Sequence, residues 1–329
     1  MSINVSCPLC GSTTVQLLCH SLSNADGPLI EKIQLFICLK CNANFTDPRI
    51  YKKDINQIQQ YEVGIYQSKK NRLSRMVDVF LAVLIDQKIK KIASMRKPDV
   101  NLLDVGCGKG RFLSRVKKRE GWLGLGIEPS QRQAEFGVEN YGVKVVTGNL
   151  TNPALAGSVF DVVTCWHVLE HIDDPAGFVA SINKLLGDDG LLVIEVPNFG
   201  SFQAVLGKGK WFHLDTPRHM FHYTKKSIER LLNNSGFYIQ KIETYSFDLG
   251  TFGMLQTILN VLNISPNLFF RWLKRCKLNE GKVEIISNLI LAAILAVPSM
   301  VLEFVVSIAL NSGGVLRIYA KKKTNPHIV

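Results

Sequence analysis

The sequence predicts an α/β fold built around a nucleotide-binding strand, loop and helix. A short apolar strand over residues 102–105 leads into this loop, and a helix is expected from Arg111. Three glycines stand at alternate positions of the loop: Gly106, Gly108 and Gly110. Glycines there let the backbone turn sharply and approach a ligand closely. A second apolar strand over 122–127 ends in Glu128, about 20 residues on, where an acid would hold ribose hydroxyls.

The N-terminal segment carries two C-x-x-C pairs. Their members are Cys7, Cys10, Cys38 and Cys41. Four thiolates complete a closed tetrahedral site of the kind that structural Zn²⁺ prefers. The gap of about 27 residues exceeds the roughly 15–20 of common ribbons and leaves room for a hairpin that returns over 33–37. We interpret residues 1–46 as a zinc ribbon stabilised largely by its metal, and a redox dithiol pair or unbound thiols is the alternative.

Residues 47–98 are expected to contain a linker and an amphipathic helix that covers the sheet. The polar first part carries Tyr51, Tyr61 and Tyr66, and it is either a linker or a lid over the ligand. Apolar residues at helical spacing mark the second part: Leu73, Met76, Val77, Phe80, Leu84, Ile85, Ile89 and Ile92. This helix should end before Pro98.

Four motifs follow one another through the centre of the chain. They are LLDVGCGKGRFL (102–113), GLGIEPS (124–130), FDVVTCWHVLEHIDDP (160–175) and GLLVIEVPN (190–198). In order and spacing they resemble the class I S-adenosylmethionine-dependent methyltransferases. The run WFHLDTPRHMFHYT (211–224) resembles a subgroup that acts on small molecules or surface-polymer precursors. The resemblance covers residues 99–245 and implies a Rossmann-like, seven-stranded methyltransferase sheet whose last strand is antiparallel.

The same resemblance implies a site for S-adenosylmethionine at the carboxyl ends of the strands. Its residues would be Asp104, Gly106, Cys107, Gly108, Gly110, Glu128, Asn149, Trp166 and His167. Asn149 stands where the family commonly has an Asp that reads the adenine amino group, and its side chain can still form a hydrogen bond. Trp166 and His167 follow the fourth strand of the core, at the edge of an α/β sheet where ligands bind.

Methyl transfer to a hydroxyl needs a base beside the acceptor, and histidine titrates near the operating pH. We expect His171 or His219 to be this base. A dense polar loop offers contacts to the acceptor: Trp211, His213, Asp215 and Arg218. Arg218 would either bind an anionic group of the acceptor or pair with Asp215 to stiffen the loop, and the sequence leaves both open.

A hydrophobic helical insertion is expected over residues 246–314, before the last strand. The segments 236–242 and 315–320 alternate like strands, and if they pair, the two ends of the insertion are adjacent. Residues 315–329 would then hold the last strand and a basic tail.

Within this insertion, the run 285–310 is apolar enough to cross a bilayer, which needs about 20 residues. However, both ends of the insertion must return to one sheet. Pro298 divides the run and Glu303 lies in its second half, which favours an interfacial helical hairpin. We therefore expect residues 271–310 to contact a membrane surface, with a basic cluster toward the headgroups. A dimer interface or a cap over an apolar substrate is the alternative.

Charge placement separates the candidate functions. The net charge is +12, but the first fifty residues are close to neutral, so the ribbon lacks the basic patch that phosphate contacts need. We expect S-adenosylmethionine-dependent O-methylation of a small-molecule, sugar or lipid-linked acceptor, with S-adenosylmethionine and zinc as cofactors. The alternatives are an RNA-modifying methyltransferase, a dehydrogenase or non-catalytic nucleotide-binding module, and C- or N-methylation of a metabolite. The polar N-terminus favours a cytoplasmic protein, peripheral on the inner face of the membrane. The oligomeric state stays open.

Overall fold

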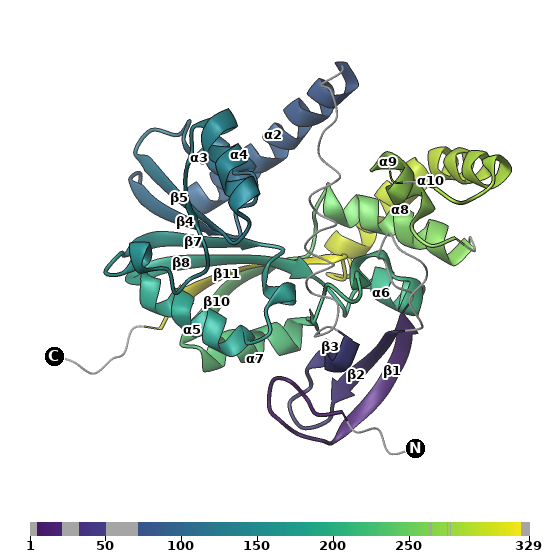
Figure 1. The fold of residues 1–329 in the computed structure, drawn as a ribbon, viewed down its shortest axis with the longest axis horizontal. Coiled ribbons are helices and arrows are strands. Elements are labelled where there is room, and N and C mark those ends of the chain that lie inside the picture. The colour runs from purple at the N-terminus through teal and green to yellow at the C-terminus, as the bar shows by residue number, and fades with distance from the viewer. Residues whose placement is uncertain are drawn as a thin grey trace.

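A seven-stranded sheet forms the centre of this computed structural model, which describes residues 5–21, 33–50, 72–262, 265–274, 276 and 278–323. Its strands are β4 (Val100–Val105), β5 (Trp122–Glu128), β6 (Lys144–Thr147), β7 (Phe160–Trp166), β8 (Leu186–Pro197), β10 (Phe237–Glu243) and β11 (Val315–Lys322). They lie in the order β10-β11-β8-β7-β4-β5-β6 (Figure 1). Strand β11 pairs antiparallel with both β8 and β10, so that Ile318 lies opposite Ile194 and Ile242. The predicted methyltransferase sheet with an antiparallel last strand is confirmed.

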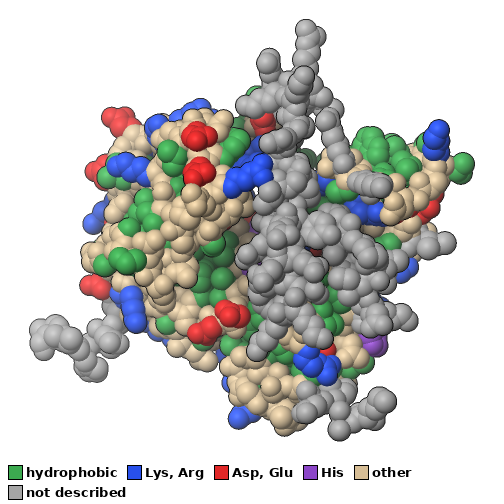
Figure 2. All heavy atoms as spheres, viewed as in Figure 1, with side chains coloured by type: hydrophobic (Ala, Val, Ile, Leu, Met, Phe, Trp, Pro, Cys, Tyr) green, Lys and Arg blue, Asp and Glu red, His purple; other side chains and the backbone are tan. Residues whose placement is uncertain are grey.

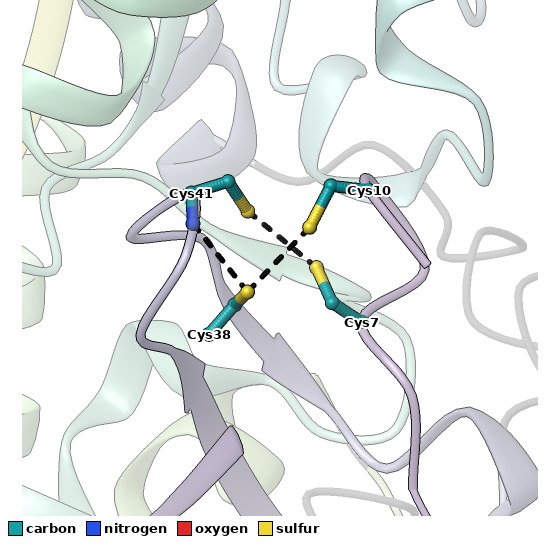
Figure 3. A group of neighbouring side chains, drawn as sticks. All are labelled: Cys7, Cys10, Cys38 and Cys41. Carbon is teal, nitrogen blue, oxygen red and sulfur yellow. Dashed lines mark hydrogen bonds between the residues drawn. The ribbon is translucent and has the colours of Figure 1, made fainter. Parts of the chain in front are cut away.

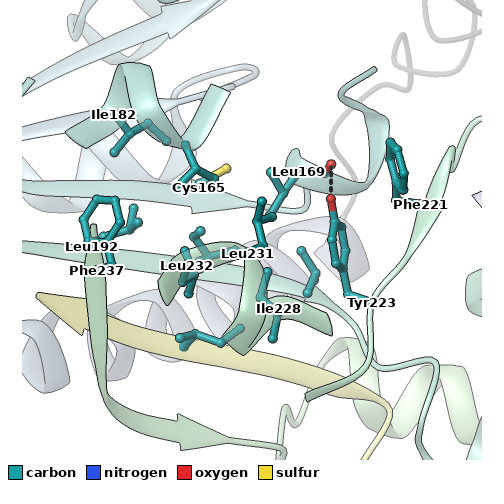
Figure 4. Packing of buried hydrophobic residues seen from close by; sticks show 14 of the residues in the cluster. Cys165, Leu169, Ile182, Leu192, Phe221, Tyr223, Ile228, Leu231, Leu232 and Phe237 are labelled. Carbon is teal, nitrogen blue, oxygen red and sulfur yellow. Dashed lines mark hydrogen bonds between the residues drawn. The ribbon is translucent and has the colours of Figure 1, made fainter. Parts of the chain in front are cut away.

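Helices cover both faces of this sheet. They are α2 (Arg72–Ala93), α3 (Arg111–Val116), α4 (Gln131–Tyr141), α5 (Pro175–Leu185) and α7 (Lys225–Asn234). Ile92 of α2 and Phe112 of α3 pack in the core on one face of the sheet, within the stretch 47–98 where a linker and a cover helix were expected for α2. On the other face, Ile182 of α5 and Leu232 of α7 pack in a second core (Figure 4). The expected linker or lid with Tyr51, Tyr61 and Tyr66 lies outside the described residues.

Short 3-10 turns lie in the connections: η1 (Pro153–Leu155), η2 (Leu169–His171), η3 (Lys208–Lys210) and η4 (Phe212–Leu214). The turn η2 is attached to the second core, because the hydroxyl of the buried Tyr223 donates a hydrogen bond to the carbonyl of Leu169 at 3.3 Å (Figure 4). Two of these turns contain expected site residues, since η2 includes His171 and η4 includes His213.

The N-terminal segment contributes three strands to a second, four-stranded sheet, in the order β1-β2-β3-β9. The strands are β1 (Val15–Ser21), β2 (Ile33–Cys38), β3 (Asn44–Thr46) and β9 (Phe221–His222). The expected return strand over 33–37 is confirmed in β2. Strand β9 comes from the core sequence, so the ribbon and the core share a sheet, which the sequence did not predict.

The insertion contains α8 (Leu249–Leu262), α9 (Leu268–Leu273) and α10 (Lys282–Ile308), and α6 (Phe202–Gly207) packs beside α8. The prediction that Pro298 divides the apolar run into a hairpin is wrong, because α10 continues through it. Proline removes one backbone donor, but Ala292 and Ser299 are buried on either side of it and hold the helix in place. The hairpin is instead made by α8 and α10, which pack against each other.

Glu303 anchors α10 to the rest of the molecule. Its Oε1 accepts hydrogen bonds from the Gly314 amide at 2.9 Å and the Ser307 hydroxyl at 3.2 Å. Its Oε2 accepts one from Gln203 Nε2 at 2.6 Å. The carboxylate is fully buried, and burial raises its pKa. Glu303 therefore attaches α10 to α6 and to the residue before β11. It does not interrupt the helix.

Candidate active site

The glycine loop lies beside Glu128, as predicted. Gly106 has φ +67°, and a Cβ there would come within 2.4 Å of a methyl group of Val168, so a larger residue is excluded. The Gly108 amide donates a hydrogen bond to Glu128 Oε2 at 2.9 Å, and the Ser130 amide donates one to Oε1 at 2.9 Å. The carboxylate is buried and fixed at the end of β5. Loop and acid together form a small cradle of backbone amides and one carboxylate.

A second buried acid stands behind this cradle. Asp104, near the end of β4, accepts a hydrogen bond from the Thr164 hydroxyl at 2.7 Å. Burial raises the pKa of Asp104 to about 7, the hydrogen bond from Thr164 opposes this, and the negative charge of Glu128 adds to it. Burial likewise raises the pKa of the Cys107 thiol, so Cys107 is a neutral neighbour rather than a nucleophile. The two acids make this edge of the sheet suited to a ligand with hydroxyl or cationic groups.

Trp166 supplies an unsatisfied donor in the same region. Its ring packs on Phe112, with 5.2 Å between centroids, and Lys88 Nζ lies 4.5 Å from its ring centroid. Its indole Nε1 is buried and has no hydrogen-bond partner within the described part of the chain. An unpaired buried donor is costly, so a ligand that accepts this hydrogen bond would fit. Asn149 lies after β6, and its Oδ1 already accepts from the Thr151 amide and hydroxyl. A contact from Asn149 to adenine therefore remains a prediction.

His167 lies between two carboxylates. Its Nδ1 is 3.1 Å from Glu170 Oε1 and its Nε2 is 3.2 Å from Glu195 Oε1. Burial lowers the pKa of His167, but the hydrogen bonds and charges of the two glutamates outweigh it and raise the pKa to about 9. Glu195 is fully buried and also binds Lys88 at 2.9 Å and Arg317 at 2.6 Å. His167 is therefore a charged member of a buried ion network, not a base.

The two expected bases lie together. The rings of His171 and His219 meet edge to face, with 4.8 Å between centroids. His171 Nδ1 donates to the Arg218 carbonyl at 3.0 Å, and His219 Nδ1 donates to the His213 carbonyl at 3.0 Å. These bonds place the lone pair of each neutral ring on Nε2. Burial, followed by the charge of His171, lowers the pKa of His219 to about 4.

Carboxylates surround this histidine pair. His219 Nε2 lies 3.9 Å from Glu170 Oε1 and 3.8 Å from Asp215 Oδ2. Glu170 Oε2 is buried without a hydrogen-bond partner among the residues that the structure describes. Two backbone positions here are strained, since His167 has φ 55° and Asp215 has φ 42°. Such strain is concentrated at functional sites. Glu170, His171 and His219 place three ligand atoms within 4.8 Å of one another and could hold a divalent cation.

The four residues expected to bind the acceptor divide into two pairs. Arg218 binds Asp215 at 2.6 Å, so the structure shows the stiffening pair that the sequence left as one of two alternatives. Trp211 and His213 are buried inside the molecule. His213 Nε2 donates to the Leu249 carbonyl at 3.1 Å, and burial lowers its pKa to about 3. A direct contact from these two side chains to an acceptor stays a prediction, whereas Asp215 and Arg218 lie at the histidine pair.

The four cysteines of the two C-x-x-C pairs converge (Figure 3). The Sγ atoms of Cys7 and Cys41 are 3.6 Å apart, as are those of Cys10 and Cys38, and all four lie within 4.8 Å. Zinc–sulfur bonds of about 2.3 Å in a tetrahedron require sulfurs about 3.8 Å apart. Burial raises the pKa of Cys38, but the amides of Cys41 and Lys40 outweigh it and lower the pKa to about 7. The donor set therefore fits Zn²⁺, and it is too open for disulfides.

Comparison with known proteins places the chain in a family. A family model described as "Methyltransferase domain" matches residues 77–242, just over half of the 329 residues. The chain belongs to this methyltransferase family. The matched region contains the glycine loop, Glu128 and η2, and it ends within β10. The resemblance inferred from the four motifs is thereby confirmed.

Two curated relatives and one solved structure show how far the similarity of this methyltransferase-family chain extends. The ubiquinone biosynthesis O-methyltransferase of Cereibacter sphaeroides is 31% identical over 133 residues, 38% of this chain and 53% of that protein. The protein of the same name from Haemophilus ducreyi is 36% identical over 107 residues, 30% and 45% respectively. The chain thus spans about half the length of these curated relatives. A solved S-adenosylmethionine-dependent methyltransferase from Archaeoglobus fulgidus is 19% identical, with a TM-score of 0.46 over 73% of this chain and 94% of that one.

Sequence reasoning missed two site residues of this methyltransferase-family protein. Glu170 stands next to His171, and Glu195 interrupts the apolar run of β8. A charged residue inside a strand buried on both faces needs a partner, and this signal could have identified Glu195. Its partners Lys88 and Arg317 are distant in sequence and could not have been named.

Proposed function

We propose that the protein transfers a methyl group from S-adenosylmethionine to a hydroxyl of a small-molecule acceptor. The family membership supports the donor, and the printed name of the curated relatives, an O-methyltransferase, supports an oxygen acceptor. The observation that carries the proposal is the pair His171 and His219, which stands at the same edge of the sheet as the glycine loop.

The cofactor would be held by the cradle at the ends of β4 and β5. Glu128 would accept hydrogen bonds from ribose hydroxyls, Trp166 Nε1 would donate to a polar atom, and the glycine loop would lie against the amino-acid portion. When bound, S-adenosylmethionine supplies an electrophilic methyl group on a positively charged sulfur. Glu128 provides a buried carboxylate in the neighbourhood of such a cation, and the cation would favour the ionised form of Asp104, whose pKa burial raises to about 7.

His171 is the proposed base. Its Nδ1–H is committed to the Arg218 carbonyl, so Nε2 would take the proton of the acceptor hydroxyl. The low pKa of His219, about 4, makes His219 a weaker proton acceptor at neutral pH and suits it to orienting the acceptor beside His171. Glu170, whose carboxylate oxygen lies within 4.8 Å of a ring nitrogen of His171, and the charge of Asp215 would stabilise the imidazolium that forms on His171.

Replacing Glu128 by alanine should weaken S-adenosylmethionine binding by about 1–3 kcal/mol, since buried ribose hydroxyls would lose an ionised acceptor. That is roughly a 5- to 150-fold rise in Kd by isothermal titration calorimetry. Glu139→Ala, which removes an exposed carboxylate of α4, is the matched control and should leave Kd unchanged. Equal affinities of Glu128→Ala and the control would exclude the ribose role.

We also propose that the insertion docks on a lipid surface, at the inner face of the membrane. Helix α10 is long and apolar enough to cross a bilayer. Its polarity is reversed for a helix in water, because it buries polar side chains: Asn288, Ser299, Glu303 and Ser307. It exposes apolar ones: Val283, Ile286, Ile290, Ile294, Val297, Val301, Phe304, Val305 and Ile308. Polar-in and apolar-out is the arrangement that lipid requires.

The position of the insertion favours lying in the membrane surface over crossing it. The chain leaves the large sheet at β10 and returns to it at β11, so both ends of the hairpin lie on one side. Hydrophobic side chains gather over α10 in Figure 2, with Lys and Arg beside them. Trp272 is exposed next to Lys274, and Lys282 begins α10. Aromatic and basic residues at the rim of an apolar face suit a lipid interface with anionic headgroups.

Vesicle flotation tests this docking. The wild type should float with vesicles that contain phosphatidylglycerol and less with pure phosphatidylcholine. Ile290→Glu combined with Ile294→Glu should reduce the floated fraction at least tenfold, because charged groups are costly in an apolar layer. The control Val205→Glu changes an exposed apolar residue of α6 and should float like the wild type. A wild type that stays with the buffer and runs as a dimer would assign the face to a second copy instead.

A further inference from the structure

Thr46, a residue of the ribbon, forms hydrogen bonds with the segment that follows His219 and leads into β9. Its side chain is 2% exposed, at the end of β3. The Thr46 hydroxyl donates a hydrogen bond to the carbonyl of His219 at 2.6 Å, and its amide donates to the carbonyl of Met220 at 2.9 Å. The same hydroxyl lies 3.0 Å from Nε2 of His222. Thr46 therefore contacts His219, Met220 and His222, through the backbone carbonyls of the first two and the ring of the third.

The strand pairing extends this attachment. Strand β3 pairs antiparallel with β9, so that Asn44 lies opposite His222 and Phe45 opposite Phe221. On the other side, the Met220 amide donates to the carbonyl of Glu170 at 2.8 Å. The segment that leaves His219 is thus bound to the ribbon and to η2, which carries Glu170 and His171.

The ribbon end of this connection begins at the cysteine cluster. Cys38 and Cys41 form the second knuckle, and the Cys38 amide donates to the Ala43 carbonyl at 2.9 Å, immediately before β3. The Cys41 carbonyl accepts from Arg230 at 3.4 Å, which ties the same knuckle to α7. Cys7 and Cys38 also pack in one hydrophobic cluster with Phe221. The knuckle is therefore connected to β3, and β3 to β9, by covalent and hydrogen bonds.

We propose that Thr46 is a positioning residue for His219, and that the metal-bound ribbon sets the geometry of the acceptor side of the site. The inference rests on the proposed function only in giving His219 a place beside the acceptor. The contacts predict that a change which disorders the ribbon also disorders residues 219–222. The ribbon would thus act on the site of its own chain, because its strand β3 is paired with β9 of the core.

Amide hydrogen exchange tests the role of Thr46 without an acceptor. Thr46→Val keeps the shape of the side chain and removes its hydroxyl, whereas Thr46→Ser keeps the hydroxyl. In the zinc-loaded protein, Thr46→Val should speed exchange in residues 219–222 at least tenfold and leave β4 and β5 unchanged. Thr46→Ser should stay within twofold of the wild type. Nitrogen-15 spectra of labelled histidines should show the His222 Nε2 signal displaced in Thr46→Val and restored in Thr46→Ser.

Zinc removal from the wild type by a chelator is the second measurement, which does not depend on how the variants fold. It should increase exchange in residues 219–222 as well as in the ribbon, while S-adenosylmethionine affinity by calorimetry stays within twofold. Exchange in 219–222 that is unchanged by both chelation and Thr46→Val, or a Thr46→Ser variant that behaves like valine, would overturn the inference. A protein that shows the coupling but binds no S-adenosylmethionine would instead refute the proposed function.

Discussion

Replacing Glu195 by alanine should lower the free energy of unfolding by about 3–5 kcal/mol, the usual cost of removing one partner of a buried ion network. Glu195 is fully buried, and the side chains of Lys88 and Arg317 that bind it are only 14% and 12% exposed. The substitution would leave two cations and His167 without their shared counter-charge. Urea denaturation followed by tryptophan fluorescence measures the loss.

The matched control is Asp189→Ala. Asp189 also binds a lysine, Lys321, at 2.6 Å, but its side chain is 69% exposed, so this pair should contribute no more than about 1 kcal/mol. Burial raises the pKa of Glu195, but the charges of Lys88 and Arg317 outweigh it and hold the pKa well below the ordinary 4.5. A lowered acid pKa adds stability above pH 4.5 that is lost as the pH falls. The difference in free energy of unfolding between the wild type and Glu195→Ala should therefore become smaller at acid pH. If Glu195→Ala and Asp189→Ala lowered the free energy of unfolding equally, the buried network would be contradicted.

Replacing Cys38 by serine should remove the metal and unfold the ribbon. The wild type should contain about one zinc per chain by elemental analysis, and Cys38→Ser close to none, because three thiolates no longer close the tetrahedron. Structural zinc supplies roughly 10–16 kcal/mol of apparent binding free energy. In the ribbon, which has little core of its own, this binding free energy would contribute directly to folding. Limited proteolysis should then cut the N-terminal segment of Cys38→Ser while the large sheet resists.

Cys19→Ser is the control for this experiment. Cys19 lies in β1, packs against the hydrophobic cluster that contains Leu35 and Trp211, and is not among the four clustered cysteines. Its variant should keep both the metal and the resistance to protease. A metal-free wild type with a resistant N-terminal segment would show that the thiols are held by packing alone.

The large sheet could be predicted because its signals are local. The apolar strands, the alternate glycines and the acid after β5 are each readable within a few residues, and the positive φ of Gly106 explains why only glycine serves there. The four cysteines were equally readable, because ligand spacing follows from the geometry of a knuckle. These features needed no knowledge of distant contacts.

The remaining features depended on contacts between distant segments. Strands β3 and β9 are too short to give an alternating pattern, so their pairing could not be read from the sequence. Pro298 was interpreted as a break, but the packing of α10 on α8 outweighs one missing hydrogen bond. The burial of Trp211 and His213 was likewise not readable from the sequence, and their contact with an acceptor stays a prediction. In each case, contacts between segments distant in the sequence determine the structure, and the local sequence pattern does not reveal them.

The position of β11 has a consequence for synthesis of the protein. It lies between β8 and β10, although it follows both in the chain, so these two strands lack their common neighbour until residues 315–322 have left the ribosome. Helix α10 emerges earlier, while the sheet that anchors Glu303 is still incomplete. The nascent chain thus displays its most apolar segment before its core has closed, and the order of translation would allow the proposed docking of α10 on lipid to begin during synthesis.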